Sequence, residues 1–281
     1  MELWFNERFR PAIYQSGAVV LGLLVIIPMF AADQTINSSS PQVRQIFVRS
    51  AKLRKLLDEV KPYGYVDVPI TQDLSSTDAS QGYSKPKSTP RGMVYDVHVS
   101  QGSDIFVENV IAHELLHAAL RHERLGSGSG TILRGRELSA NDLAAMQGLI
   151  MSLTNCYQDA IIDRRMAKLG FNPQLLQDDE KSTLIAEANV VPRTSLYKRD
   201  ATLMLYCLSI RLRKFEMDEI YTAYKSWYPE LAQDVQTVSN TVGPDLCDTE
   251  ESCFKKMLAL RKAVGLEGEV KFINPTTNRK E

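Results

Sequence analysis

The sequence predicts a mainly helical α+β fold with a small β-sheet. Apolar residues recur at helical spacing over several stretches, of which residues 43–60, 104–120 and 139–169 are the clearest. Two short stretches have the composition of strands, residues 65–70 and residues 93–100, and in the latter apolar and polar residues alternate. With 281 residues and no internal repeat, the chain can bury a substantial core.

The N-terminal segment is the most apolar part of the chain. Residues 17–32 carry no charge, and with residues 11–16 they make about 22 residues, enough for a helix that spans a bilayer. The same run suits the core of a signal peptide, although Phe30 is larger than the residue wanted before a cleavage site at Ala32. A buried helix is the remaining alternative. We therefore expect residues 1–32 to be a signal peptide or a membrane anchor, which places the protein in the periplasm or at the membrane of the cell envelope.

The elements after this segment are expected in the following order. A polar, serine-rich linker occupies residues 33–42 and leads into the first helix. Between the two strands, residues 72–91 are rich in Ser, Thr, Gly, Pro and Lys, which predicts a long surface loop. The glycine-rich residues 125–131, after the second strand and its helix, form either a mobile lid or a plain flexible connection. The remainder is helical, with helices at residues 195–215, 217–228 and 254–264 and a loose tail at residues 274–281.

Charge and cysteine content narrow the class of protein. With 33 basic and 34 acidic residues the formal net charge is -1, so the whole chain offers no electrostatic footprint for nucleic acid. An even number of cysteines, 4, fits two disulfides in an exported protein. Cys247 and Cys253 enclose a short polar turn and are the expected pair. Cys156 and Cys207 lie in apolar helical patterns, where buried free thiols and a second disulfide both remain open.

Residues 113–117 read His-Glu-Leu-Leu-His and point most directly to a chemical function. Histidines four residues apart lie on the same helical face, so His113 and His117 can bind one metal ion. Glu114 stands beside them, and this HExxH pattern is that of the active-site helix of zinc metallopeptidases. We therefore predict one catalytic Zn²⁺ and hydrolysis of peptide bonds by metal-activated water, with Glu114 as the general base and a peptide or protein as the substrate.

A catalytic zinc site also needs a third protein ligand and an open position for water. Asp159 is the favoured ligand, because it lies on a helix long enough to pack along the zinc-binding helix. Glu137 is an alternative, since it stands 20 residues after His117, near the spacing of zincins that use a glutamate. It precedes the second helix, however, which counts against it.

Three further polar residues complete the set of candidates. Asp163 and Asn155 share one helical stripe with Asp159, and we expect them to orient the ligand histidines from either side. Asp163 is also an alternative ligand. His122, a further alternative, lies five positions after His117 and is rotated by about 140° from it, so it points away from the metal unless the helix has ended.

These residues resemble a group of predicted bacterial metallopeptidase domains with the pattern HExxHxxxxH, followed downstream by NxxxDxxI. The first part is matched by His113, Glu114, His117 and His122, and the second by Asn155, Asp159 and Ile162, with Asp163 where the pattern usually has Asn. The metzincin pattern, in contrast, is not met, because Leu120 and Glu123 replace its Gly and His. The resemblance implies a zincin-like catalytic core at residues 43–175 with Asp159 as the third zinc ligand. Residues 176–273 are then a helical C-terminal part of the same domain.

Two other functions fit the same sequence. A zinc amidase acting on a non-protein, cell-wall substrate would use the same site chemistry. A non-catalytic envelope protein could retain the motif as a vestigial metal site.

Overall fold

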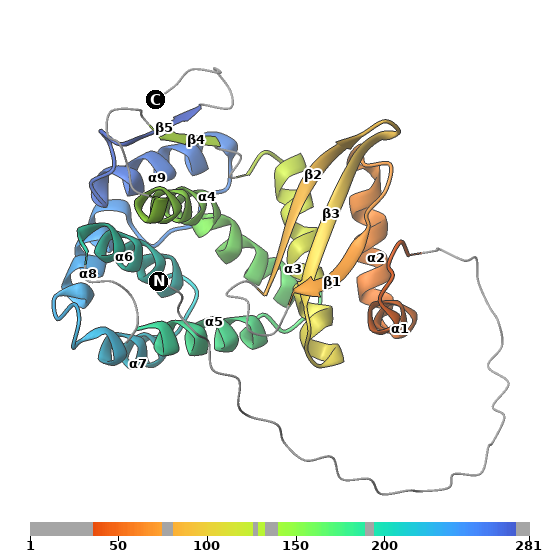
Figure 1. The fold of residues 1–281 in the computed structure, drawn as a ribbon, viewed down its shortest axis with the longest axis horizontal. Coiled ribbons are helices and arrows are strands. Elements are labelled where there is room, and N and C mark those ends of the chain that lie inside the picture. The colour runs from red at the N-terminus through yellow and green to blue at the C-terminus, as the bar shows by residue number, and fades with distance from the viewer. Residues whose placement is uncertain (1–35, 75–80, 126–128, 133–139, 189–193, 274–281) are drawn as a thin grey trace, which may run out of the picture. The chain divides into compact units, whose positions relative to one another are not determined.

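The computed structural model describes residues 36–74, 81–125, 129–132, 140–188 and 194–273, and Figure 1 shows their arrangement. The predicted class is confirmed, because helices dominate and the strands form only a three-stranded sheet and a separate two-stranded sheet. The expected signal or anchor segment at residues 1–32 and the tail lie outside the described residues. Among the described helices, none has the length and apolar character needed to cross a bilayer.

The three-stranded sheet has the order β1-β3-β2 and lies beside the metal-motif helix. Its strands are β1 (Ile70–Leu74), β2 (Gly82–Thr89) and β3 (Gly92–Ser100). The central strand β3 pairs in parallel with β1 and antiparallel with β2, which leaves β2 at one edge. Alternate residues of β3 are fully buried, as expected for a strand with one face on the core: Tyr95, Val97 and Val99.

Two strand predictions need correction. The first strand, β1, starts later than the predicted residues 65–70 and overlaps them only at Ile70, while Asp67 forms an isolated bridge to Val94. The surface loop predicted at residues 72–91 is wrong at residues 72–74 and 82–89, which belong to β1 and β2. The physical reason is that β2 is a largely exposed edge strand, and Lys, Ser and Pro are residues that edge strands tolerate and that loops also favour.

The first helical segment is interrupted at Ser50. Helix α1 (Pro41–Arg49) ends there, and α2 (Ala51–Val60) begins directly after it, where one helix was predicted. The Ser50 hydroxyl accepts a hydrogen bond from the backbone N–H of Leu53 and so caps α2, which favours the break. A short 3₁₀ turn, Lys61–Tyr63, follows α2.

Helix α3 (Asp104–His122) carries the His-Glu-Leu-Leu-His motif and lies at the centre of the described chain. Ser103 caps its N-terminus by accepting from the backbone N–H of Phe106, and Asp104 in the first turn complements the helix dipole. The helix contacts β2, β3, α1, α2, α4 and α5. These contacts bury most of its length, so its two motif histidines are held on a rigid element.

The C-terminal part of the chain is a group of helices around α4 (Ala140–Lys168), which packs on α3, α6 and α9. The helices that follow are α5 (Gln174–Glu187), α6 (Ser195–Ser209), α7 (Lys214–Tyr224), α8 (Leu231–Val242) and α9 (Glu250–Ala263). Strands β4 (Ser129–Ile132) and β5 (Val270–Ile273) form the two-stranded sheet, which was not predicted.

The helices predicted at residues 195–215 and 217–228 divide at a different place. Helix α6 ends at Ser209, and α7 starts at Lys214, so residues 210–213 form a connection. The Glu216 carboxylate accepts from the backbone N–H of Arg213 at 2.8 Å and caps α7, which explains its early start. This connection contains Arg211, whose side chain reaches the candidate site.

Both cysteine pairs form disulfides. Cys247 and Cys253 are joined as predicted, and Cys156 of α4 is joined to Cys207 of α6, which settles the alternative left open by the sequence. The Cys156–Cys207 disulfide joins residues 51 positions apart. By restricting the unfolded chain, a bridge across a loop of that length contributes about 4 kcal/mol to the free energy of unfolding. Two disulfides are compatible with an oxidising compartment.

Candidate metal centre

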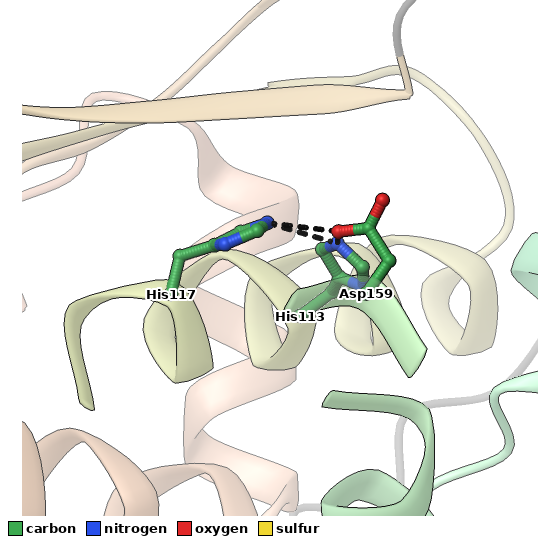
Figure 2. Close-up of side chains that lie close together, drawn as sticks. All are labelled: His113, His117 and Asp159. Carbon is green, nitrogen blue, oxygen red and sulfur yellow. Dashed lines mark hydrogen bonds and ion pairs between the residues drawn. The ribbon is translucent and has the colours of Figure 1, made fainter. Parts of the chain in front are cut away.

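Three side chains from two helices converge on one point (Figure 2). His113 and His117 stand one turn apart on α3, and Asp159 reaches them from α4. The two Nε2 atoms are 3.2 Å apart, and Asp159 Oδ1 lies 3.6 Å from His113 Nε2 and 3.5 Å from His117 Nε2. Three potential donor atoms at such separations could hold one metal ion.

The packing of α3 on α4 produces this convergence. Leu115 and Leu116 of α3 and Leu153 and Ile162 of α4 are buried in the common core, so each helix presents a fixed face to its neighbour. His113 and Asp159 retain 14% and 24% of their side-chain exposure. The site is therefore shielded but still open to an incoming ligand.

Gln158 orients one of the histidines. Its Oε1 lies 3.0 Å from Nδ1 of His117, and since an amide oxygen only accepts, this contact favours a proton on Nδ1. The lone pair of Nε2 is then free for a metal. Burial, together with the neighbouring His113, lowers the pKa of His117, which favours the same neutral ring.

Asp159 favours its ionised form. Burial alone would raise the pKa of its carboxyl group, but the adjacent His113 outweighs this effect and holds the pKa at about 2. Burial likewise disfavours a charged His113, and Asp159 outweighs it and raises the pKa of His113. The pair therefore binds a positive charge, which is supplied either by a proton on His113 or by a metal ion.

A buried arginine lies behind Asp159. Arg211, only 5% exposed, donates from Nε to Asp163 Oδ2 at 2.7 Å and from Nη1 to Glu180 Oε2 at 2.9 Å. Its Nη1 is also 4.0 Å from Asp159 Oδ2. Burial works against the charge of the guanidinium, but Glu180, Asp163 and Asp159 outweigh it and raise the pKa of Arg211. One cation among three carboxylates leaves an excess of negative charge, which a divalent cation would neutralise.

Glu114 projects from α3 towards the edge strand. It is 5% exposed, and its Oε2 accepts a hydrogen bond from the Ser84 hydroxyl of β2 at 2.7 Å. Gly82 permits this close approach of strand and helix, because a Cβ there would lie 2.7 Å from Val110 Cγ1 and 3.2 Å from Glu114 Oε1. Ser84 thus fixes the carboxylate through Oε2.

The candidate metal ligands and Glu114 line one cavity of about 520 Å³. Its walls come from β2, α3, α4, α5 and α6, together with Arg211. The cavity therefore brings the possible metal ligands and a neighbouring carboxylate to one concave space.

The remaining candidates from the sequence lie in different places. Asn155 lines the cavity one turn before Asp159. Asp163 contacts Arg211 and Gln177 rather than a ligand histidine. His122 ends α3 and stacks on Tyr63 with ring centroids 4.2 Å apart, away from the metal ligands. Glu137 lies outside the described residues.

Four residues that shape the site could not be recognised from local sequence patterns. Ser84 and Gly82 fall in the stretch predicted as a loop, and Arg211 and Glu180 belong to no motif. Gln158 could have been noticed, because it adjoins Asp159 on a helix that had already been assigned to the site. The others act through tertiary contacts that no local pattern encodes.

Replacing Gln158 with alanine is expected to lower the zinc affinity by about 10- to 100-fold, because the ring of His117 loses the partner that fixes its orientation and tautomer. Competition with a chromophoric chelator measures the affinity. Gln147→Ala, an exposed position on the same helix, is the matched control and should bind zinc as the wild type does. An unchanged affinity in Gln158→Ala would show that the contact has no part in metal binding.

Comparisons with protein-family models, with curated proteins and with solved structures found no match. A function for this chain therefore has to be argued from the geometry of its own residues.

Proposed function

We propose that this chain is a zinc-dependent peptidase of the zincin type. The observation that carries the proposal is the triangle of donor atoms from His113, His117 and Asp159, which opens on a cavity that also contains Glu114. Two imidazoles and one carboxylate leave a fourth position for water or substrate, as catalytic zinc sites do.

Zinc is the metal that best suits these ligands. A tetrahedral zinc ion with bonds of about 2.0–2.1 Å holds its ligand atoms about 3.3–3.4 Å apart. The three separations here, 3.2, 3.5 and 3.6 Å, bracket that value. Calcium and magnesium prefer a shell of oxygen atoms, so two imidazoles count against them.

In the proposed mechanism, a zinc ion held by His113, His117 and Asp159 would supply Lewis acidity, which lowers the pKa of water towards about 7. Glu114 accepts the proton of the attacking water at Oε1 and later delivers it to the leaving amine. Ser84 keeps the other carboxylate oxygen in place by its hydrogen bond. Gln158 holds the ring of His117, and Arg211 stabilises the negative charge of Asp159 from behind.

The location we propose is the cell envelope, either the periplasm or the membrane surface through an uncleaved N-terminal anchor. The two disulfides support an exported protein, since such bridges persist in oxidising compartments. The substrate is accordingly a peptide or protein of that compartment.

Two measurements on the purified protein test the proposal. We expect about one zinc per chain by elemental analysis, and cleavage of a complex peptide mixture that stops on chelation and returns with zinc. A chain that binds no metal would contradict both the zinc site and the enzyme. A zinc-loaded chain that cleaves cell-wall material but no peptide would instead be an amidase.

A further inference from the structure

The cavity extends beyond the metal ligands along α5. Asp179, Glu180, Thr183, Leu184 and Glu187 all line it and recur at helical spacing, so one face of α5 forms a continuous wall. Glu180 belongs to the network of Arg211 beside the candidate metal ligands. Glu187 stands seven residues later, which is about 10 Å further along the helix axis. The cavity therefore has a second region, remote from the metal ligands, that the proposed chemistry does not use.

The cavity is also lined by apolar side chains from three helices. Leu184 of α5, Met151 of α4 and Met204 of α6 line the cavity. Asp200, one turn before Met204 on α6, lies close to Glu187: burial and then the charge of Glu187 raise the pKa of Asp200 to about 6. Glu187, at the end of α5, is thus within electrostatic range of Asp200 on α6. Methionines are flexible and fit themselves to the methylene groups of a ligand.

Whereas Asp200 is not among the lining residues, Glu187 is the carboxylate of this region that lines the cavity. It is half-buried, and in the described part of the chain no hydrogen bond or ion pair of its carboxylate is found. Burial raises its pKa, which reflects the cost of holding an unpaired carboxylate away from water. A cation placed beside it would relieve that cost.

The charged groups that line the whole cavity also favour a cationic ligand. Two guanidinium groups line it, those of Arg121 and Arg211, and Arg211 is already paired with Asp163 and Glu180. The carboxylates that line it are more numerous: Glu114, Asp159, Asp179, Glu180 and Glu187. With all five carboxylates ionised, they outnumber the charges of the two guanidinium groups and a divalent metal, and such a lining favours cationic groups over acidic ones.

We propose that the Glu187 region, formed by Glu187, Leu184, Met151 and Met204, is a specificity pocket for a lysine or arginine side chain of the substrate. The methylene groups of that side chain pack against the apolar residues, and its cationic end pairs with Glu187. The inference rests on the proposed peptidase function and names its substrate class: peptides with a basic residue near the scissile bond.

The test uses peptides that differ at a single position. The best-cleaved peptide is synthesised with lysine, norleucine or glutamate at each position flanking the cut in turn, and kcat/KM is measured for the zinc-loaded enzyme. At one position we expect kcat/KM for the lysine peptide to exceed that for the norleucine peptide by about tenfold or more, and the glutamate peptide to have the lowest kcat/KM. A charge-assisted hydrogen bond in a shielded site corresponds to a factor of about that size. In Glu187→Gln the ratio of lysine to norleucine should fall towards one. Asp178→Asn, an exposed carboxylate on α5 that does not line the cavity, should keep the wild-type ratio.

A binding measurement separates this inference from the proposed function. The same peptides are titrated by fluorescence anisotropy into zinc-loaded Glu114→Gln, with and without Glu187→Gln. Tighter binding of the lysine peptide that depends on Glu187 supports the pocket, even if no peptide is cleaved and the peptidase proposal fails. The proposal of a specificity pocket is overturned if the lysine and norleucine peptides have equal kcat/KM and equal affinity. It is also overturned if the preference for lysine persists in Glu187→Gln.

Discussion

Replacing Glu114 with glutamine is expected to lower peptide hydrolysis by about two orders of magnitude or more. The amide has the size of the carboxylate and can still accept the hydrogen bond of Ser84, so the position of the side chain should persist. It cannot take up a proton at neutral pH, however, and the attacking water loses its base. The metal content should remain that of the wild type, because Glu114 is not among the converging ligand atoms. Initial rates and elemental analysis on the same preparation measure both quantities.

A glutamate directly after α3 provides the control for this experiment. Glu123 does not line the cavity that contains Glu114, and it pairs with Arg165 at 2.6 Å. Glu123→Gln should therefore keep both its zinc and its activity. Undiminished turnover in Glu114→Gln would remove Glu114 from the mechanism, whereas loss of zinc would assign it a structural part in the metal site.

The three converging side chains of the site could be predicted from the sequence, because each prediction depends only on the spacing of residues along a helix. Histidines at positions 113 and 117 share a helical face wherever a helix forms, and the apolar residues around them made that helix certain to be buried. Asp159 was favoured on similar grounds, as the polar residue of a long helix. The structure brings these three side chains together.

The rest of the cavity could not be predicted, because it is made by contacts between distant segments. β2 has the polar composition of a loop, and it is a strand only because β3 offers its edge. Arg211 lies between two helices that appeared to meet elsewhere, and its partners Asp163 and Glu180 come from α4 and α5. Neither the packing of the helices nor the position of Glu187 in the cavity lining has a local pattern in the sequence.

Replacing Asp159 with alanine is expected to remove zinc binding almost completely. The change deletes one of three ligand atoms together with its negative charge, so the loss of affinity should exceed the about 10- to 100-fold caused by removing an outer partner. It also leaves Arg211 beside a site that should hold a second cation, which opposes zinc further. Zinc content after dialysis and chelator competition give the affinity.

Three parallel variants test the alternative ligands. Glu137→Ala and His122→Ala should keep full zinc, and His122 is held instead by its stacking on Tyr63. Asp163→Ala should also keep most of its zinc but unfold at a lower temperature, because Arg211 then loses a buried partner at 2.7 Å. Thermal unfolding, measured without zinc, separates that structural loss from a loss of metal affinity. Full zinc occupancy in Asp159→Ala, with loss in one of the other three, would transfer the role of third ligand to that residue and would require α4 to present a different face to α3.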